Sequence, residues 1–566
     1  MSSTSVTPSV LIVGAGPAGS VLALTLLKNG IPVRIVDKEG PQIGQKGLGV
    51  QPRSLEMHHF LGTLPDFLSI ARRLPVCNIY KTPGGTEILK TIEIDPFEEP
   101  TPDSPYINSL MLGQHRQQSI LHRHLEKYGC KAEFLTEMRS FQQFDDHVLA
   151  TLVTKDQDGT EISETVKVPY LVGTDGAHST VRKALGLNFL GETRDDVNMI
   201  IGDIHVKGGL ERKFWHSWGE PSKLVALIPT EVDDDIFTFM IGGTESDQAK
   251  TASGRDELVK TISFITDRTD IDFGELVWIS RYRPNIRMVD KFGEGRVFVA
   301  GDAAHIHSPT GGQGTNSGVQ DSFNLGWKLA LVLKGVSPSS LLATYTEERL
   351  PVIAAMLDKS TLLLNRSLAP SPVQGHNWER GKEFKQLGVN YRGSSTLVDE
   401  TIALTQDLTP TDSYSLASDG VIHAGDRAPQ APSLETLHSN RNHSPALTSL
   451  FDIFGPDHHT LLVFGSSKFN GEAIASELSA YPQNLFKTVL ILPTVGTSES
   501  ELSDLVTQTS GVDLLLRDRD GYAHKYYPAL PGPSTLVVVR PDGVVGAIVG
   551  GVEGLHQYLK GVFLTM

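Results

Sequence analysis

The sequence contains few of the features that would place the protein in a special structural class. Only two of its 566 residues are cysteines, Cys77 and Cys130, which excludes a disulfide scaffold and a CxxC redox or zinc site. No uninterrupted apolar run reaches the roughly 18 residues that a membrane-spanning helix needs. The first ten residues, MSSTSVTPSV, lack the basic and apolar stretches typical of a signal peptide. We therefore expect a cytoplasmic protein with no membrane span.

Basic residues are also in short supply. The chain has 50 lysines and arginines against 66 aspartates and glutamates, which gives a formal net charge of −16 at pH 7. Such an acidic chain repels polyanions, so no nucleic-acid partner is expected. Hydrophobic residues make up 39% and charged residues 20% of the chain, a globular balance that excludes a disordered or fibrous protein. The length predicts about three or four domains of ordinary size.

The first motif is a glycine-rich turn between a predicted strand, Val10–Val13, and an apolar helix. Gly14 permits a tight turn, Gly16 lets the backbone approach a pyrophosphate, and Gly19 lets the helix pack on the strand. The N-terminal N–H groups and the dipole of that helix can hold the phosphates. Asp37, at the end of the next strand, can accept both hydroxyls of an adenosine ribose. The unit predicts dinucleotide binding, with a ligand-free glycine turn as the alternative, and does not separate FAD from NAD.

Two later motifs favour FAD. The first, YLVGTDGAHSTVR, is read as a strand that ends at Asp175, followed by a helix start with Arg182. The second, GDAAHIHSPTGGQGTN, begins at Gly301, and its Asp302 closes a strand where the carboxylate can bind a ribityl hydroxyl. Its loop opens into a long helix, whose N-terminal N–H groups can hold the negative charge of reduced flavin near N1 and the C2 carbonyl. Further cofactor-binding candidates in this loop are Gly312, Gly314, Thr315 and Asn316.

In this order and spacing the three motifs resemble those of the group A flavoprotein monooxygenases, the single-component aromatic hydroxylases. The similarity is closest to their phenol hydroxylase-like branch and covers essentially the whole chain. It implies an α/β fold with a para-hydroxybenzoate hydroxylase-type, Rossmann-like FAD-binding domain, an inserted β-sheet substrate domain and a C-terminal thioredoxin-like α/β domain. It also implies that NADPH or NADH reduces FAD, that O₂ then forms a C4a-hydroperoxyflavin, and that one oxygen atom passes to a phenolic ring.

The resemblance extends the set of cofactor residues. It implies that Gln114, before a predicted helix, faces the ribityl chain, and that Gln51 and Arg53 lie near the cofactor. Lys38, next to Asp37, is a further candidate. FAD is expected to be held without a covalent bond, since no His or Cys lies where such families attach flavin. Only one GxGxxG occurs, so NADPH or NADH is expected to bind transiently on a shared surface.

Changes in sequence pattern divide the chain into domains. The predicted boundaries are 1–190 and 280–367 for the FAD-binding domain, with part of 75–112 a candidate for the substrate domain, then 191–279 for the substrate domain, 368–425 for a linker and 426–566 for the thioredoxin-like domain. In the long helix after Asn316, an apolar face with Val319, Phe323, Trp327 and Leu331 is expected to pack on the FAD-domain sheet. The C-terminal domain contains no cysteine, which excludes a thiol redox role and leaves dimer packing or structural support.

No motif identifies the residues that contact the substrate. The candidates for catalytic residues are Tyr282 and His216 in the middle of the chain and Pro309 in the flavin loop, with ordinary packing as the alternative for Tyr282 and His216. His305 and His307 have no acid or cysteine cluster that would complete a metal site, so no metal is expected. Trp215, Trp218, Trp278, Arg281 and Arg287 are further candidates for substrate contacts.

The expected activity is NAD(P)H- and O₂-dependent hydroxylation of a small aromatic or phenolic substrate, with a homodimer as one option. Decarboxylative hydroxylation of a hydroxybenzoate-type or prenylated phenolic acid, oxygenation of a larger polyketide, and a flavin-binding scaffold without turnover stay open. A flavin halogenase would carry a WxWxIP segment, which WHSWGEP at Trp215–Pro221 does not match. A short-chain NAD dehydrogenase would need a YxxxK pair, which the chain lacks.

Overall fold

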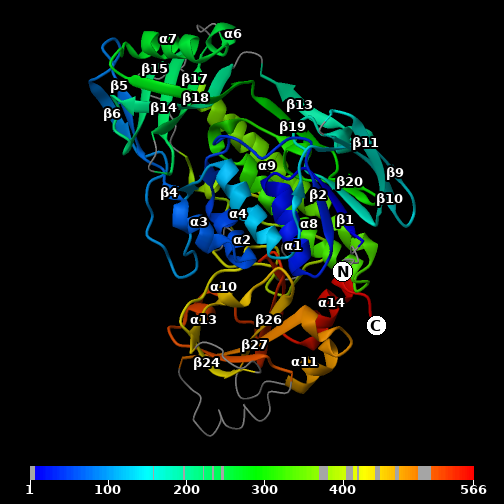
Figure 1. Ribbon diagram of the computed structural model, residues 1–566. Helices are drawn as coiled ribbons and strands as arrows, with labels where there is room; N and C mark the ends of the chain where they lie inside the picture. The colour runs from blue at the N-terminus through cyan, green and yellow to red at the C-terminus, as the bar shows by residue number, and fades with distance from the viewer. Residues whose placement is uncertain are drawn as a thin grey trace.

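Two large sheets lie at opposite ends of the molecule, with a nucleotide-binding unit between them (Figure 1). The computed structural model describes residues 7–156, 158–194, 198–220, 222–232, 235–243, 248–368, 380–402, 412–416, 420–439, 446–465, 471–494 and 511–565. The mixed α/β architecture expected from the sequence is confirmed. Within the described ranges, no helix combines the length and the apolar character that a membrane crossing requires.

The nucleotide-binding unit contains a six-stranded, mainly parallel sheet and the helices beside it. These elements are β1 (Val10–Val13), β2 (Val33–Val36), β8 (Ala132–Glu133), β12 (Tyr170–Gly173), β20 (Gly293–Glu294), β21 (Val297–Val299), α1 (Pro17–Lys28), α4 (Gln114–Glu126), α5 (Thr180–Ala184) and α8 (Gly314–Leu333). The strand order is β20-β21-β12-β1-β2-β8. Every residue of β1 and β12 is buried, as expected for parallel strands whose two faces are both covered.

Three small sheets and three further helices surround this unit. They are β9 (Thr136–Gln143), β10 (Val148–Lys155) and β11 (Glu161–Val168); β13 (Phe189–Thr193), β19 (Asn285–Val289) and β22 (His305–Ile306); β3 (Gly49–Val50), β4 (Arg72–Arg73) and β7 (Leu110–Met111); and α2 (Pro52–Leu61), α3 (Leu64–Ile70) and α9 (Ala343–Leu368). Strand β19 pairs with both β13 and β22, so it ties the strand that leads out of the FAD unit to the Asp302 motif.

The seven-stranded sheet forms the middle part of the chain. Its elements are β5 (Val76–Tyr80), β6 (Ile88–Ile92), β14 (Met199–Gly208), β15 (Phe214–Glu220), β16 (Lys223–Pro229), β17 (Ile236–Gly242) and β18 (Asp272–Tyr282), with α6 (Gln248–Thr251) and α7 (Arg255–Thr266). The order is β18-β14-β17-β16-β15-β5-β6, and only the β15–β5 pair is parallel. Residues from 76–92 thus complete a sheet whose other strands lie more than 100 residues further along the chain.

The two faces of this sheet have different partners. On one face, Leu258 and Ile262 of α7 pack with Phe237 and Phe239. On the other face, Trp215 packs with residues of β5, β7 and β16 in a separate apolar cluster. Helix α7 therefore covers one side of the sheet, which leaves the Trp215 side turned toward the nucleotide-binding unit (Figure 1).

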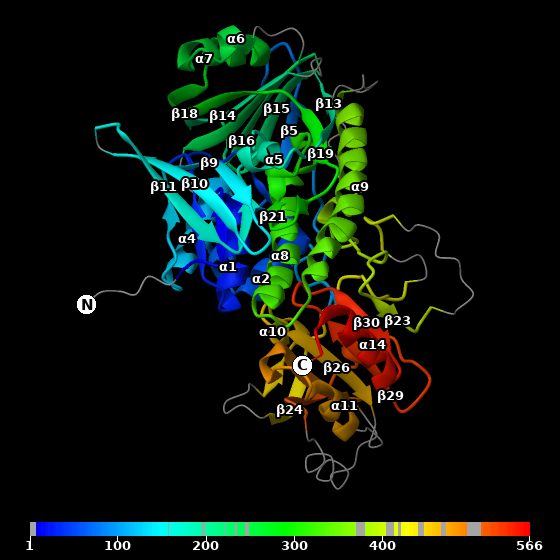
Figure 2. The same cartoon turned by 90° about the vertical axis from the view of Figure 1, so that its right-hand side faces the viewer.

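Helix α8 is more deeply buried than its sequence indicates. Val319 and Phe323 join the core of the nucleotide-binding unit, but Trp327 and Leu331 pack into the core of the C-terminal domain. The expectation that one apolar face packs on the FAD-domain sheet is therefore wrong for its second half. A helix that is buried all round needs partners on more than one side, and α8 runs from the centre of the molecule toward the C-terminal sheet (Figure 2).

The C-terminal domain contains an eight-stranded sheet in the order β23-β30-β29-β26-β27-β28-β24-β25. Its elements are β23 (Val398–Asp399), β24 (Leu434–Ser439), β25 (Leu447–Thr448), β26 (His459–Gly465), β27 (Phe486–Leu492), β28 (Leu514–Asp518), β29 (Ser534–Val539), β30 (Val545–Val549), α10 (Leu450–Ile453), α11 (Gly471–Leu478), α13 (Tyr522–Tyr526) and α14 (Val552–Val562). The sequence predicts strands at 460–464, 489–492, 513–516 and 535–539, and these correspond to β26, β27, β28 and β29, which confirms the four predictions.

The segment 368–425, predicted to be a linker, is partly folded onto the core. Residues 369–379, 403–411 and 417–419 lie outside the described residues. In the described parts, Gln386 donates its side-chain amide to Gln313 in the flavin loop at 2.7 Å, and Tyr414 donates its hydroxyl to the same Gln313 oxygen at 2.6 Å. Strand β23 extends the C-terminal sheet. Composition alone indicated loops and could not show these long-range hydrogen bonds.

Candidate active site

The glycine turn after β1 has the geometry that the sequence predicts. Gly14 has φ +109°, and a Cβ there would lie 2.3 Å from the carbonyl oxygen of Thr174. A Cβ at Gly19 would lie 2.0 Å from the carbonyl oxygen of Gly14. At Gly16, by contrast, the nearest neighbour is Gln118 Nε2 at 3.8 Å. Gly14 and Gly19 are thus required by the packing of the chain itself, whereas Gly16 borders open space.

This open space lies at the N-terminus of α1. Gly16 is the N-cap residue, and its helix has no side-chain cap, so N–H groups of the first turn are available to a phosphate. Asp37 accepts hydrogen bonds from the backbone N–H of Ala15 at 2.8 Å and of Glu39 at 2.9 Å. Its carboxylate is therefore held beside the turn, where the sequence predicts a ribose. Lys38 is exposed at the same edge.

The Asp175 motif organises the Asp302 motif. Asp175 accepts hydrogen bonds from the Ser179 hydroxyl at 2.5 Å and from the backbone N–H of Thr180 at 2.7 Å, at the start of α5. Arg182, in that helix, donates to the carbonyl oxygen of Ala303 at 3.0 Å and lies over the Phe189 ring. Arg182 thus holds the residue next to Asp302.

A buried ion cluster holds the other side of the same turn. Asp321 in α8 accepts hydrogen bonds from the N–H of Gly301 at 3.0 Å, from His305 at 2.6 Å and from Arg349 at 2.7 Å. Burial alone would raise the pKa of Asp321, but Arg349 and His305 lower it to about 2. Asp321 is therefore a carboxylate at neutral pH. It fixes the backbone of Gly301, which has φ +59°.

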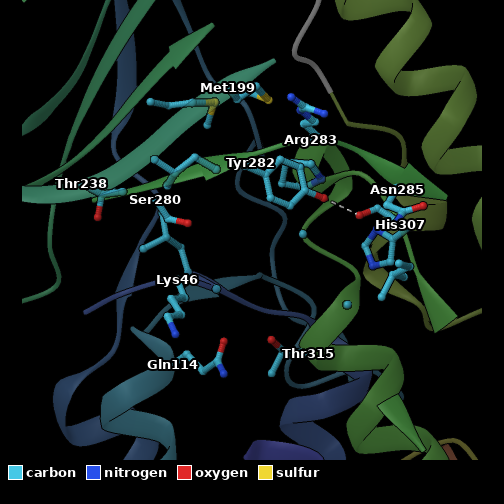
Figure 3. Close-up of a pocket in the computed structure, with 18 of the residues that line it drawn as sticks. Lys46, Gln114, Met199, Thr238, Ser280, Tyr282, Arg283, Asn285, His307 and Thr315 are labelled. Carbon is cyan, nitrogen blue, oxygen red and sulfur yellow. Dashed lines mark hydrogen bonds between the residues drawn. The ribbon is translucent and has the colours of Figure 1, made fainter. Parts of the chain in front are cut away.

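A cavity of about 2030 Å³ lies between this turn and the seven-stranded sheet. One wall contains candidates from the flavin motifs, and the facing wall is the Trp215 side of the sheet. Figure 3 shows Gln114 and Thr315 on one side of the cavity and Thr238, Ser280 and Met199 across from them. The predicted residues that the structure brings together around this cavity are Gln114, Tyr282, Asp302, Pro309, Gly312, Gly314 and Thr315, with Trp215, Trp278, Arg281 and Arg287 among the substrate-contact candidates.

Asp302 has the properties of an acceptor for a cavity ligand. Its side chain lies within the protein yet is exposed to the cavity, and the described residues provide no hydrogen-bond partner for its carboxylate. The surrounding protein raises the pKa of Asp302 by desolvation, an effect that His305 opposes. Hydrogen bonds from ligand hydroxyls would stabilise this carboxylate.

Removing the Asp302 carboxylate is expected to weaken FAD binding. Asp302→Ala deletes the charged acceptor of a buried hydroxyl, which costs on the order of 1.5–3 kcal/mol and so raises the Kd for FAD by roughly tenfold or more. Titration of the apoprotein with FAD, followed by flavin fluorescence, measures this. Asp290→Ala removes a surface carboxylate bonded to Asn188 and is the matched control. Equal FAD affinity for Asp302→Ala and wild type would contradict the assignment.

Tyr282 and Pro309 line the cavity, but Tyr282 is not poised as a base. Its hydroxyl donates to the carbonyl oxygen of His307 at 2.8 Å (Figure 3). Burial raises the pKa of Tyr282 above its ordinary value, so the hydroxyl stays protonated at neutral pH. Its contact supports the loop that leads to Pro309. A packing and positioning role is what this geometry favours for Tyr282.

The prediction that His216 is a catalytic residue is wrong, because His216 lies on the face of β15 that is turned away from the cavity. Successive side chains of a strand point to opposite faces, so the neighbouring Trp215 faces the cavity and His216 faces α7. His216 is 2% exposed. Its ring nitrogens bond the Tyr80 hydroxyl at 2.7 Å and the Glu211 carbonyl oxygen at 2.9 Å, and burial lowers its pKa. His216 is a core residue of the sheet.

The prediction that Arg53 lies near the cofactor is also wrong. Its guanidinium bonds Glu56 at 2.7 Å and the carbonyl oxygens of Asp542 and Gly543, in the C-terminal domain, at 2.9 and 3.3 Å. It is buried and does not line the cavity. The spacing of Arg53 and Glu56, three residues apart on a helix, is a signal for such an ion pair. The C-terminal contact could not be found from local sequence.

Gln51 and Asn316 connect two walls of the cofactor region without lining the cavity. The Asn316 side chain accepts a hydrogen bond from the N–H of Gln51 at 2.8 Å and donates to the carbonyl oxygens of Gly49 and Gly312 at 2.9 and 2.8 Å. Both residues are buried. They hold the loop that contains Gly49 against the start of α8, which begins without a side-chain cap.

Sequence reasoning missed Arg380. It comes from the segment predicted to be a linker, lines the cavity, and places Nη1 3.4 Å from where a Cβ on Gly312 would lie. Desolvation lowers its pKa, although Asp95 opposes the effect. Because Arg380 stands alone in a loop-rich sequence, no motif marks it. The cavity thus gains a cation beside the glycine loop.

These features fit one cofactor. The uncapped N-terminus of α1, with the open Gly16, suits the pyrophosphate of FAD. The Asp302 carboxylate suits the ribityl chain, and the uncapped N-terminus of α8 suits the pyrimidine ring. The fold and site define an FAD-binding oxidoreductase. The chain belongs to the FAD binding domain family, which matches residues 7–360.

Known proteins with a similar sequence or structure carry related activities. A flavin-dependent monooxygenase of Mycobacteroides abscessus is 38% identical over 467 residues, which cover 81% of this chain and 89% of that protein. A 6-methylpretetramide 4-monooxygenase of Streptomyces rimosus is 36% identical over 370 residues, 65% of this chain and 64% of that protein. A solved aklavinone-11 hydroxylase, in complex with FAD and aklavinone, has a TM-score of 0.77 and 26% identity over 99% of both chains. The protein is an FAD-dependent monooxygenase, similar to the group A aromatic hydroxylases.

Proposed function

We propose that the protein hydroxylates a polycyclic phenolic compound in a reaction that consumes NAD(P)H and O₂. The observation that carries this proposal is the size of the cavity, about 2030 Å³, against roughly 300–1,000 Å³ for ordinary ligand pockets. FAD would fill part of this volume. The remainder exceeds what a single phenol ring would fill, and water left around a small ligand would compete with oxygen transfer.

The names of similar proteins support a substrate of this class. One relative is named for 6-methylpretetramide and the solved structure holds aklavinone, both polycyclic aromatic compounds. Apolar and aromatic side chains on the sheet wall offer a flat surface of matching character. These side chains are Met199, Ile201, Trp215, Leu224, Ile228, Met240 and Trp278.

Different residues of this chain would bind FAD and shield the substrate from water. Gly16 and the first turn of α1 would hold the pyrophosphate, Asp302 and Gln114 the ribityl chain, and the N-terminus of α8 the flavin ring. Bound FAD supplies the capacity to take electrons from NAD(P)H and activate O₂. The apolar sheet wall would exclude water from the ring that is oxygenated. Tyr282 would keep the loop around Pro309 in place through its bond to His307.

Decarboxylative hydroxylation of a phenolic acid is the alternative that one observation favours. Arg281 is exposed on the cavity wall at the end of β18, and Arg380 lies on the wall beside Gly312. Either guanidinium could bind a carboxylate. A flavin-binding scaffold without turnover would share the same cavity and would consume no NAD(P)H.

A substrate comparison tests the proposal. Purified enzyme with FAD, NADPH and O₂ is given aklavinone, a tetracycline, phenol or 4-hydroxybenzoate, and products are analysed by mass spectrometry. We expect a product heavier by one oxygen atom from a polycyclic compound and only hydrogen peroxide with the single-ring phenols. A product of 4-hydroxybenzoate that has gained a hydroxyl and lost its carboxyl group would favour the alternative. If NADPH is consumed no faster than in an enzyme-free control with every compound, the result would favour a flavin-binding scaffold without turnover.

For the C-terminal domain we propose a thioredoxin-like fold with a supporting role. Strands β27-β26-β29-β30 lie in that order, β26 pairs in parallel with β27 and antiparallel with β29, and α14 ends the unit. This order and polarity support the fold. Buried hydrogen bonds from Arg53 to the Asp542–Gly543 turn favour structural support over dimer packing as its role.

A further inference from the structure

Asp203, in β14 of the seven-stranded sheet, is a buried carboxylate that the flavin motifs leave unexplained. It is 1% exposed and accepts hydrogen bonds from three groups. One oxygen accepts the Thr238 hydroxyl at 2.8 Å. The other accepts the indole N–H of Trp278 and the backbone N–H of Gln45 at 2.8 Å. Thr238 and Trp278 belong to the sheet wall of the cavity, whereas Gln45 belongs to the loop 44–49.

Hydrogen bonds continue from Gln45 to the opposite wall. Its carbonyl oxygen accepts the backbone N–H of Gln114 at 2.9 Å, at the first residue of α4. Its side-chain amide donates to Glu231 at 3.0 Å, and Glu231 also accepts the N–H of Gly113 at 3.2 Å. Gln114 and the neighbouring Thr315 line the wall where the flavin is expected (Figure 3). Asp203 and Gln45 thus form a bridge behind the cavity from one wall to the other.

Packing along this bridge is tight. Gly44 has φ +80°, and a Cβ there would lie 1.9 Å from Trp278 Nε1. A Cβ on Gly113 would lie 1.9 Å from Gln45 Oε1, and this oxygen is buried with no hydrogen-bond partner in the described part of the chain. The loop 44–49 therefore rests directly on the Trp278 ring. Because no free space separates the ring from the loop, a shift of the ring must also move the loop.

We propose that Asp203 is a positioning residue that couples the substrate wall to the flavin-bordering loop 44–49. A ligand that packs on Trp278 and Thr238 changes the two bonds that these residues make to Asp203, and the third bond carries the change to Gln45. The loop then moves Gly47 and Gly49, which line the cavity beside Gln114 and Thr315. This coupling rests on the proposed function, because it assumes that the sheet wall receives the substrate.

Asp203→Asn tests the coupling. The amide has the shape of the carboxylate, but its NH₂ group cannot accept the hydrogen bonds that the carboxylate oxygen in its place accepts from the surrounding donors. Hydrogen–deuterium exchange of the FAD-loaded protein is measured over residues 44–49, where no substrate is needed. We expect exchange there to be faster by about tenfold or more, with little change in the Kd for FAD. Trp278→Phe removes the indole donor together with part of the ring on which Gly44 packs, and should change exchange in the same direction. Asp235→Asn, which neutralises a carboxylate bonded to His205 beside the start of β17 in the same sheet, is the control.

A second readout separates positioning from structural support. Reduction of the bound flavin by NADPH in the absence of substrate should be faster in Asp203→Asn and in Trp278→Phe than in the control. If Asp203→Asn does not fold, Trp278→Phe and Thr238→Val each remove one bond and carry the test. Unchanged exchange over 44–49 in the folded variants would overturn the coupling. If NADPH fails to reduce the wild-type flavin even when a polycyclic phenol is present, the proposed function fails, and the exchange experiment still decides whether Asp203 couples the sheet wall to loop 44–49.

Discussion

Replacing Glu348 by glutamine is expected to lower the free energy of unfolding by about 3–5 kcal/mol, because the change breaks a buried ion cluster. Glu348 lies in α9 and bonds Lys328 of α8 at 2.8 Å and Arg540 of the C-terminal domain at 2.7 and 2.9 Å. These three side chains are at most 1% exposed. Loss of the carboxylate charge leaves Lys328 without its ion-pair partner, while Arg540 keeps Asp542. Denaturant titration followed by tryptophan fluorescence measures the effect.

The neighbouring residue supplies the control. Glu347 is exposed and bonds only Ser395 among the described residues, so Glu347→Gln should change stability little. Adding Lys328→Met to Glu348→Gln should recover part of the loss, because it removes the cation whose ion pair with Glu348 is lost. If Glu348→Gln were as stable as Glu347→Gln, the cluster would not be the connection between α9 and the C-terminal domain that its geometry indicates.

Acid pH should reduce the difference between Glu348→Gln and wild type. Burial alone would raise the pKa of Glu348, but Arg540 and Lys328 hold it well below its ordinary value. A lowered pKa in the folded state gives stability that is present above the unfolded pKa, about 4.3, and is lost as the pH falls below it. The variant lacks this contribution, so the two unfolding curves should approach each other below about pH 4.

Rules that depend on neighbouring residues alone were sufficient to predict much of the nucleotide-binding unit. The bounds of the strand Val10–Val13 follow from its apolar pattern, and the different needs of Gly14, Gly16 and Gly19 follow from backbone sterics. The structure agrees with both. The cavity-lining positions of Asp302 and Gln114 came from motifs of the family. In each case the information lies within a few residues along the chain.

Long-range contacts set the limit of the sequence prediction. Arg53 bonds a turn 489 residues away, and Trp327 finds its partners in the C-terminal domain rather than on the FAD-domain sheet. His216 shows a different limit. Its type suits acid–base chemistry, but the register of β15 decides which face it occupies, and a shift of one residue would have placed it in the cavity.

Reduction of the flavin by NADPH is expected to be slow without substrate and faster by several orders of magnitude with it. The described residues contain a single glycine turn of the dinucleotide-binding kind, and one cavity reaches both the flavin motifs and the substrate sheet. NADPH and substrate must therefore share access to the same flavin. A flavin reduced before a substrate is present would only convert O₂ to hydrogen peroxide, so an effective monooxygenase delays reduction.

Gly47 offers a way to test where this control lies. A Cβ there would lie 2.9 Å from the Thr315 hydroxyl and 3.4 Å from Gln114 Oε1. Gly47→Val should therefore hinder movement between the loop and the two walls, and slow reduction more than it weakens FAD binding. Stopped-flow reduction by NADPH, with and without a polycyclic phenol that the enzyme turns over, measures both effects. Equal rates in wild type with and without that phenol would rule out substrate control, and would favour a flavin oxidase or dehydrogenase that needs no signal from the substrate wall.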